Sequence, residues 1–448
     1  MRIAIDYVKK YKENFSTKFN VFEKILYFLI VLPSLFLLVN NYPYLLIFSI
    51  LIVAFLGLIF FLYKKEVASY HKGILGVLII IYTYFIISYF FSNQSISNFL
   101  SYGFLKYDGN FFFCYILFFI LAVPFFDYKE VSKVYFKLIF IVFSAFSIFG
   151  IFEYISGYSS FMIERDAYVG KIFKALNFAH NATGSVYAVV SVFALIFFLR
   201  ERNKHTKLYY LFVLLICLTG LFLTKSRGSY LGFVIGSLFV VWINYRSFKK
   251  FIKTLLGIII LTLPLIFFTG VYKRIIQIFD FSDVNILRRL EFWDKAWYMF
   301  SRSPMFGIGY GRFNDIYQRD LNRLIGYPGV ISFYMDPNYY FNASHAHNSY
   351  LQFLTETGIL GLALLIIFWS LCFIIIFRAY LNTRDEFSKK VFLSGVGSIV
   401  TLFALSLTEN YFSATTVMIC ISMVVSISIG LYWQENKLND IKSKHKLR

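Results

Sequence analysis

The stretch HAHNSYLQFLTETGILGLALLIIFWSLCFIIIF, from His345 to Phe377, joins a polar beginning to a long apolar run. The run over 354–377 exceeds the roughly 20 residues that a helix needs to cross a bilayer core of about 30 Å. A helix continuing from His347 at about 100° per residue would place Gly358 roughly 20° from the histidine and Gly361 roughly 40° away on the other side. We therefore predict a membrane helix whose small-residue face carries a histidine at the membrane surface.

Apolar runs of this kind recur along the whole chain of 448 residues, of which 59% are hydrophobic and 22% aromatic. A soluble domain of this size could not bury so much apolar surface. Runs of membrane-spanning length fall at 22–39, 42–63, 73–92, 111–127, 134–156, 182–199, 208–223, 229–244, 251–271, 354–377, 391–412 and 414–433. The sequence thus predicts an all-α polytopic membrane protein with about twelve transmembrane helices.

The basic residues predict the orientation of these helices. With twelve spans, 29 of the 44 Lys and Arg residues fall on the side of the two tails, and 15 fall on the other side. The positive-inside bias places both termini in the cytoplasm. The net charge of +20 is then explained by the orientation of the helices and by attraction to anionic lipid, and it does not indicate nucleic-acid binding.

The predicted organisation has five parts. They are a basic amphipathic cytoplasmic tail (1–21), nine transmembrane helices (22–271), a large outer loop (272–348), three transmembrane helices (349–433) and a second basic tail (434–448). Long loops in compact proteins are usually functional. Within this loop, Ile286, Leu290, Trp293, Trp297 and Phe300 form an apolar stripe at helical spacing, which predicts an interfacial helix over 284–300.

His347 is the first candidate for chemistry, because histidine can accept a proton from a hydroxyl near neutral pH. The alternative is a histidine that only caps a helix or makes an interfacial hydrogen bond. His345 could compete for the same role, but it lies outside the glycine-matched face.

Arginines on the same outer side are candidates for binding an anion. Arg227 precedes a predicted span, where free N–H groups and the helix dipole favour an anion, and guanidinium binds phosphate oxygens bidentately. Arg288 and Arg289 stand on the proposed interfacial helix. The alternatives are an arginine extending to lipid headgroups and electrostatic anchoring to the membrane.

Four further residues could support such a site: Lys225, Asn348, His180 and Asn181. Helix capping is the default reading of Asn181. Glu356 and Glu409 lie near the outer ends of spans, where we expect an ion pair with one of the arginines. No Asp, Glu or His cluster has recognisable metal-ligand spacing, so the sequence predicts neither a metal nor another cofactor.

Two motifs carry a family resemblance. The first reads His347, Asn348, nine residues, Gly358, two residues and Gly361, and the second pairs Arg289-x-x-x-Trp293 with Pro304-x-x-Gly307-x-Gly309-x-Gly311. With the Ser226-Arg227-Gly228 element, they resemble the O-antigen ligase and O-antigen polymerase family of bacterial envelope glycosyltransferases. The likeness is best over about 180–412.

The resemblance implies a C-type glycosyltransferase fold in the bacterial inner membrane, with its active site facing the periplasm. It implies an undecaprenyl-diphosphate-linked glycan as donor and no metal. Carried over, Arg227 and Arg289 would bind the diphosphate, with Arg288 able to share the role of Arg289. His347 would deprotonate the acceptor hydroxyl.

The expected activity is that of a ligase, which moves a finished polysaccharide onto a sugar of the lipid A core. The alternative is a polymerase that joins repeat units on a growing glycan attached to the same carrier. A protein O-oligosaccharyltransferase is a further option. A lipid-linked oligosaccharide flippase is disfavoured, because charges are scarce in the spans and gather on the outer side.

Overall fold

The computed structural model describes residues 71–91, 129–157, 162–166, 170–176, 179–277, 284–313 and 345–446, together with positions 38 and 55. In this part of the chain, eight helices are long and apolar enough to cross a membrane, and each overlaps a predicted span. The chain is therefore a polytopic helical membrane protein. The predicted tail 1–21, residues 314–344 of the loop, and the spans at 22–39, 42–63 and 111–127 fall outside the described residues, apart from positions 38 and 55.

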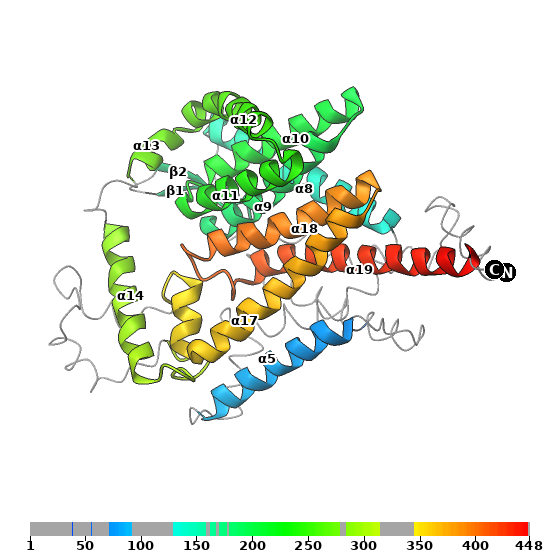
Figure 1. Cartoon of the computed structure of the whole chain (residues 1–448). Helices are drawn as coiled ribbons and strands as arrows, with labels where there is room; N and C mark the ends of the chain where they lie inside the picture. The colour runs from blue at the N-terminus through cyan, green and yellow to red at the C-terminus, as the bar shows by residue number, and fades with distance from the viewer. Residues whose placement is uncertain are drawn as a thin grey trace.

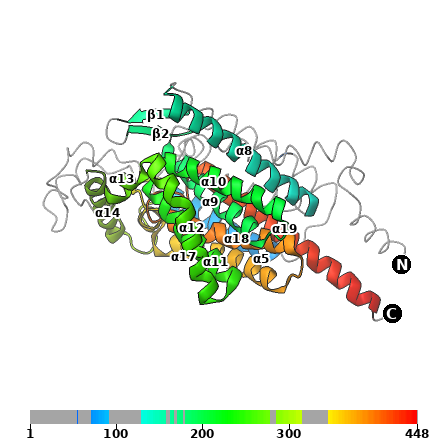
Figure 2. The same ribbon diagram turned by 90° about the horizontal axis from the view of Figure 1, so that it is seen from above.

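The helices in chain order are α5 (His71–Phe91), α8 (Lys129–Ser156), α9 (His180–Arg200), α10 (Lys204–Leu223), α11 (Arg227–Tyr245), α12 (Phe248–Thr269), α13 (Val271–Ile276), α14 (Val284–Arg302), α17 (Ser349–Asn382), α18 (Glu386–Leu405) and α19 (Thr415–Lys446). Helix α9 lies at the centre and packs against α10, α11, α18 and α19. Helices α17 and α5 lie together on the other side of α18, and α14 stands at one end of the bundle (Figure 1). Seen from above, α8 runs along the edge of the bundle (Figure 2).

Small residues bring α9 and α11 close together. A side chain at Gly184 would overlap Thr224, Ser226 and Ser229, and the hydroxyls of Ser185 and Ser229 lie 3.1 Å apart. Close backbone approach through small residues is the usual way for membrane helices to associate, since lipid tails remove the hydrophobic drive. The beginnings of α9 and α11 are therefore held side by side.

A stripe of glycines does the same between α11 and α18. Gly228, Gly232 and Gly236 recur every fourth residue and so share one helix face. Their backbones meet side chains at the end of α18 and just after it, from Thr401 to Thr408. The first turn of α11 is thereby fixed beside the connection between α18 and α19.

The helix predicted to run unbroken from His347 differs from the observed one. Helix α17 begins at Ser349, capped by the Asn348 side chain, and it is interrupted at Gly358, where φ is 67° and ψ is −172°. His347 lies before the cap with a φ of 48°. The prediction that His347 and the two glycines share one helix face is therefore wrong. The first turns of α17 stand at an angle to the rest (Figure 1).

At the interruption around Gly358, the backbone of α17 hydrogen-bonds to the backbone of the segment that follows α14. The amide of Ile359 donates to the Pro304 carbonyl at 2.9 Å, and the amide of Ile308 donates to the Thr355 carbonyl at 3.0 Å. A side chain at Gly358 would overlap the Met305 carbonyl. On the other side of this contact, Gly307, Gly309 and Gly311 all have positive φ. The two glycine motifs thus contact each other directly.

Helix α14 confirms the helix predicted over 284–300, but its buried face differs from the predicted stripe. Phe292, Ala296 and Met299 are buried and pack with Phe313 and Ala346. Trp297, a member of the predicted stripe, is 58% exposed. The side of α14 that faces the protein is therefore rotated from the stripe. Contact of the stripe with a membrane stays a prediction.

A short β-hairpin departs from the predicted all-α fold. Strands β1 (Ile163–Asp166) and β2 (Gly170–Phe173) pair antiparallel between α8 and α9. The positive φ of Gly170 at the turn suits glycine, which has no β-carbon to clash. The Glu153 carboxylate also accepts hydrogen bonds from the amides of Met162 and Ile163. These bonds satisfy backbone groups that a helix would otherwise have paired.

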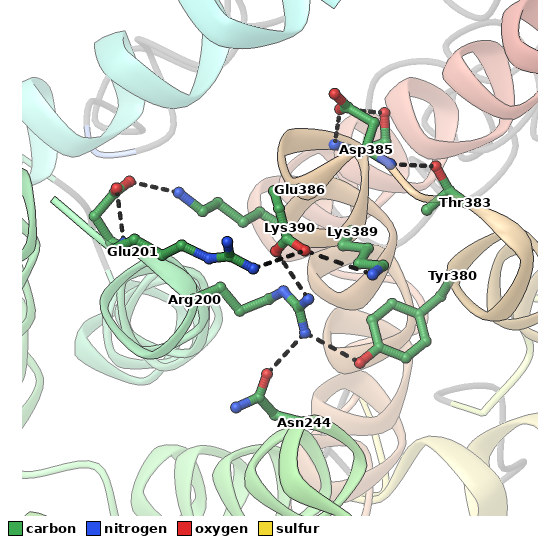
Figure 3. Close-up of polar contacts among 11 residues, drawn as sticks. Arg200, Glu201, Asn244, Tyr380, Thr383, Asp385, Glu386, Lys389 and Lys390 are labelled. Atoms are coloured by element: carbon green, nitrogen blue, oxygen red, sulfur yellow. Dashed lines mark hydrogen bonds and ion pairs between the residues drawn. The ribbon is translucent and has the colours of Figure 1, made fainter.

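Ion pairs and hydrogen bonds join α9, α11, α17 and α18 at the other end of α9, where the Arg200 guanidinium also donates to the Tyr380 hydroxyl of α17 at 3.3 Å (Figure 3). Arg200 pairs with Glu386 at 3.0 Å and donates to Asn244 at 2.9 Å, while Lys390 pairs with Glu201 at 2.6 Å. Exposed ion pairs contribute little, but a partly buried network fixes geometry. The ends of α9, α11 and α17 and the start of α18 are therefore held together at the end away from His180.

Candidate functional site

A pocket of about 180 Å³ lies at the end of the bundle where α9 and α11 begin. Its walls come from these two helix starts, helices α13 and α14, His347 just before α17 and the connection between α18 and α19. All the site residues predicted from the sequence except Asn348 line it: His180, Asn181, Lys225, Arg227, Arg288, Arg289 and His347. Segments that are far apart in the sequence meet here.

The charge of the pocket is strongly positive. Its lining includes the basic side chains of Lys225, Arg227, Arg274, Arg288 and Arg289, and one carboxylate, that of Glu409. Like charges gathered in a cleft raise the local concentration of a ligand of opposite sign. The pocket is suited to an anion with several oxygen atoms.

Arg227 is the first residue of α11, and its guanidinium donates to the Gln277 carbonyl at the end of α13. The first turn of α11 has no acidic residue, so the positive end of the helix dipole is not offset locally. Arg274, which the sequence reasoning missed, comes from α13 beside it. Its only signal in the sequence was its place in the long outer loop.

Lys225 is buried in the turn before α11 and donates to the Thr269 carbonyl at the end of α12. Burial is the main cause that lowers its pKa to about 8, and the charges of Arg274 and Lys273 lower it further. The ammonium therefore loses its proton in the mildly alkaline range, and the pocket then loses one positive charge.

This pKa predicts how anion binding depends on pH. We expect inorganic diphosphate to bind Lys225→Met about 10-fold more weakly than the wild type near pH 7, because a charged hydrogen bond is lost. The gap should close as the pH rises through about 8, and calorimetric titration of the purified chain measures it. Ionisation of the diphosphate acts on both proteins alike. A gap that does not change with pH would contradict the assignment.

Arg288 and Arg289 both reach the pocket from α14. Their electrostatic partners differ, however. The Arg289 charge acts on Glu409 and His345, whereas the Arg288 charge acts on Glu291. Arg289 is thus the one more closely coupled to the histidines, in agreement with the motif.

His347 lines the pocket, and three contacts hold its ring. Its Nδ1 is 2.6 Å from a Glu409 carboxylate oxygen, and its ring stacks on Phe292 with centroids 5.5 Å apart and planes 15° apart. The ring of His345 lies 4.1 Å away. The left-handed backbone of His347, rather than a helix face, directs the side chain to the pocket.

His345 is a poor proton acceptor by comparison. Burial lowers its pKa to about 4, against the opposing effect of Glu409 and with smaller contributions from His347 and Arg289. Its Nδ1 accepts a hydrogen bond from the His347 amide at 3.2 Å. Of the two histidines, His347 is therefore the better candidate for a general base.

Asn348, Asn181 and His180 have different surroundings. Asn348 caps α17 by accepting from the amides of Tyr350 and Leu351. Asn181 was predicted to cap a helix, but the N-cap position of α9 is Ala179. The Asn181 side-chain amide instead donates to Glu409 at 3.5 Å. His180 lines the pocket as the first residue of α9.

The connection between α18 and α19 contributes Glu409 to the pocket lining. The predicted span at 391–412 ends early, because α18 stops at Leu405. Glu409 was expected to pair with an arginine, but the ionisable side chains within ion-pair distance of its carboxylate in the described residues are those of His347, at 2.6 Å, and His345, at 3.5 Å. Glu356, for which an arginine partner was also expected, has a carboxylate that accepts hydrogen bonds from the Gln352 side chain and from the Phe313 amide.

His345, His347 and Glu409 also present ligand-type atoms within 4.8 Å of one another. Sequence spacing could not show this group, because Glu409 comes from another helix connection. The five basic side chains of the same pocket would repel a divalent cation. The closest contact in the group, at 2.6 Å, has the length of a charge-assisted hydrogen bond. The arrangement fits a histidine paired with a carboxylate better than a metal centre.

These features define a polytopic membrane protein with a cationic, histidine-containing pocket at one end of its helix bundle. A family model described as O-antigen ligase matches residues 212–366. This match confirms, over residues 212–366, the resemblance to the O-antigen ligase and polymerase family noted in the sequence. Members of this family are membrane glycosyltransferase-like enzymes, and the match supports a ligase- or polymerase-type role in glycan assembly.

The matched region covers only some of the pocket. It includes Arg227, Arg274, both α14 arginines and His347, while His180, Asn181 and Glu409 lie beyond it. No curated protein shows significant similarity to the chain.

Proposed function

We propose that this protein is an O-antigen ligase of the bacterial inner membrane. It takes a polysaccharide from undecaprenyl diphosphate and transfers it to a sugar hydroxyl of the lipid A core, on the periplasmic side. The single observation that carries this proposal is the meeting of Arg227, Arg289 and His347 in one pocket. The arginines can bind a diphosphate and the histidine can take a proton from a hydroxyl, and the transfer needs both groups side by side.

The proposed reaction follows from the placement of these groups. Arg227 and Arg289 hold the diphosphate and stabilise its growing charge as it leaves. His347 removes the proton of the acceptor hydroxyl. The acceptor oxygen forms a bond to the anomeric carbon, and the bond from that carbon to the phosphate oxygen breaks with its electron pair going to the diphosphate.

An apolar groove supports a lipid-linked donor. It has a volume of about 590 Å³ and is lined by residues of α11, α17 and α18 and by Leu407. Thr408, the next residue, lines the polar pocket. Tyr350, close to His347 in sequence, lines the groove as well. An isoprenoid chain in this groove would bring its diphosphate to the arginines.

The test uses the full-length chain in lipid nanodiscs with an undecaprenyl-diphosphate glycan. One reaction contains lipid A core as acceptor, and a parallel one contains a second lipid-linked repeat unit. Glycan attached to the core, seen by gel and mass spectrometry, supports the ligase. Chain growth on the lipid carrier supports the polymerase alternative, and no transfer to either acceptor contradicts both.

In this assay we expect Arg289→Ala to raise the KM for the donor about 10- to 100-fold, since a charge-assisted hydrogen bond contributes about 1.5–3 kcal/mol. Arg302→Ala is the matched control, because Arg302 is exposed at the end of the same helix and does not line the pocket. An equal effect of the two substitutions would argue for general electrostatic attraction and against a diphosphate contact.

A further inference from the structure

Glu409 is held in a defined position against His347. One carboxylate oxygen is 2.6 Å from His347 Nδ1, and the other accepts from Asn181 at 3.5 Å. The side chain is only 14% exposed. A carboxylate so enclosed costs desolvation free energy unless partners compensate for it.

Hydrogen bonds fix the connection that carries Glu409 to the start of α17. The Ser349 hydroxyl donates to the Glu409 carbonyl at 2.9 Å, and the Ser349 amide donates to the Ser406 carbonyl at 2.9 Å. The Asn348 side chain donates to the Leu407 carbonyl at 3.2 Å. Residues just after His347 thus bind Glu409 itself and residues just before it, and the two side chains keep a fixed relation.

Burial acts to raise the pKa of Glu409, but the hydrogen bond and charge of His347, with the charges of His345 and Arg289, bring it down to about 2. The carboxyl group is therefore ionised throughout the neutral range. It can accept a hydrogen bond from the imidazole and cannot donate one.

A carboxylate at Nδ1 has two consequences for an imidazole base. It keeps the proton on Nδ1, which leaves the Nε2 lone pair free to accept another proton. It also stabilises the imidazolium that forms, as in hydrolases with a carboxylate–histidine pair. The stacking of His347 on Phe292 also holds the plane of the imidazole ring in a fixed orientation.

We propose that Glu409 is a positioning residue that sets the tautomer and orientation of His347 for proton abstraction. This inference rests on the proposed function, in which His347 is the base. The acceptor hydroxyl gives its proton to Nε2, its oxygen bonds to the anomeric carbon, and the diphosphate leaves. Glu409 stays ionised and touches neither substrate.

The test compares Glu409→Gln and Glu409→Asp with the wild type in the nanodisc assay. For Glu409→Gln we expect kcat to fall on the order of 100-fold with little change in the KM for the donor. Glu409→Asp, which keeps the charge, should recover about 10-fold of that loss.

Glu386→Gln serves as control, since it removes an arginine-paired carboxylate at the other end of the bundle. Adding Glu409→Gln to His347→Ala should cause no further loss, because the carboxylate acts only through the ring. A wild-type rate for Glu409→Gln, or an additive loss in the double variant, overturns the proposal. So does loss of activity in EDTA with recovery in Zn²⁺, which would indicate a metal site. An inactive wild type would instead reject the proposed function itself.

Discussion

Replacing His347 with alanine should lower the rate of glycan transfer about 1000-fold, which is within the range that a general base contributes. The ring is the group in the pocket lining whose Nδ1 is held by Glu409 and whose face stacks on Phe292. Its removal leaves the acceptor hydroxyl without a base, while the arginines of the pocket remain. We therefore expect kcat to fall and the KM for the donor to change little.

The measurement is steady-state transfer by the full-length chain in nanodiscs, with donor binding titrated separately. His205→Ala is a suitable control, because His205 is exposed at the beginning of α10, at the other end of the bundle. A rate for His347→Ala within about 10-fold of the wild type would show that His347 is not the base.

The second large effect concerns folding. Gly358→Ala should destabilise the protein by about 4 kcal/mol or more, at the extreme of single substitutions. Gly358 has a φ of 67°, which disfavours any residue with a β-carbon. That β-carbon would also overlap the Met305 carbonyl and the Phe306 amide. The contact between the glycine motifs would separate, and α14 would lose its anchor next to His347.

The melting temperature of the detergent-solubilised protein, read from the fraction that stays in the monodisperse size-exclusion peak after heating, measures this loss of stability. Gly257→Ala is the matched control, because Gly257 lies within α12 with no atom near its β-carbon position. There alanine should be neutral or stabilising by up to about 1 kcal/mol. Equal melting temperatures for Gly358→Ala and the wild type would show that the interruption of α17 can close or shift.

Much of the helical framework could be predicted from the sequence. Even the short runs at 208–223 and 229–244 correspond to α10 and α11. Arg227, Arg289 and His347 were recognisable because each stands at the end or outside of an apolar run, where a polar side chain has few structural uses. Residue type and position relative to the membrane made them candidates, and the motifs of the resembled family supplied the roles that remain predictions.

Other features depended on contacts between distant segments. Gly358 looked like a small residue on a continuous helix, because helical periodicity carries no information about a backbone that docks from outside. Glu409 looked like a partner for an arginine, because its sequence gives no sign that the connection is tied to Ser349. Arg274 had no motif at all.

The amino-acid sequence by itself determined which segments enter the membrane and which side chains remain at their ends, because the transfer of apolar residues into lipid is a local property of each segment. Only the tertiary structure decided that a carboxylate from the connection after α18 meets a histidine before α17. It also decided that α17 is interrupted where another backbone docks. These arrangements arise from close packing and hydrogen bonding between segments far apart in the chain, which no local pattern encodes.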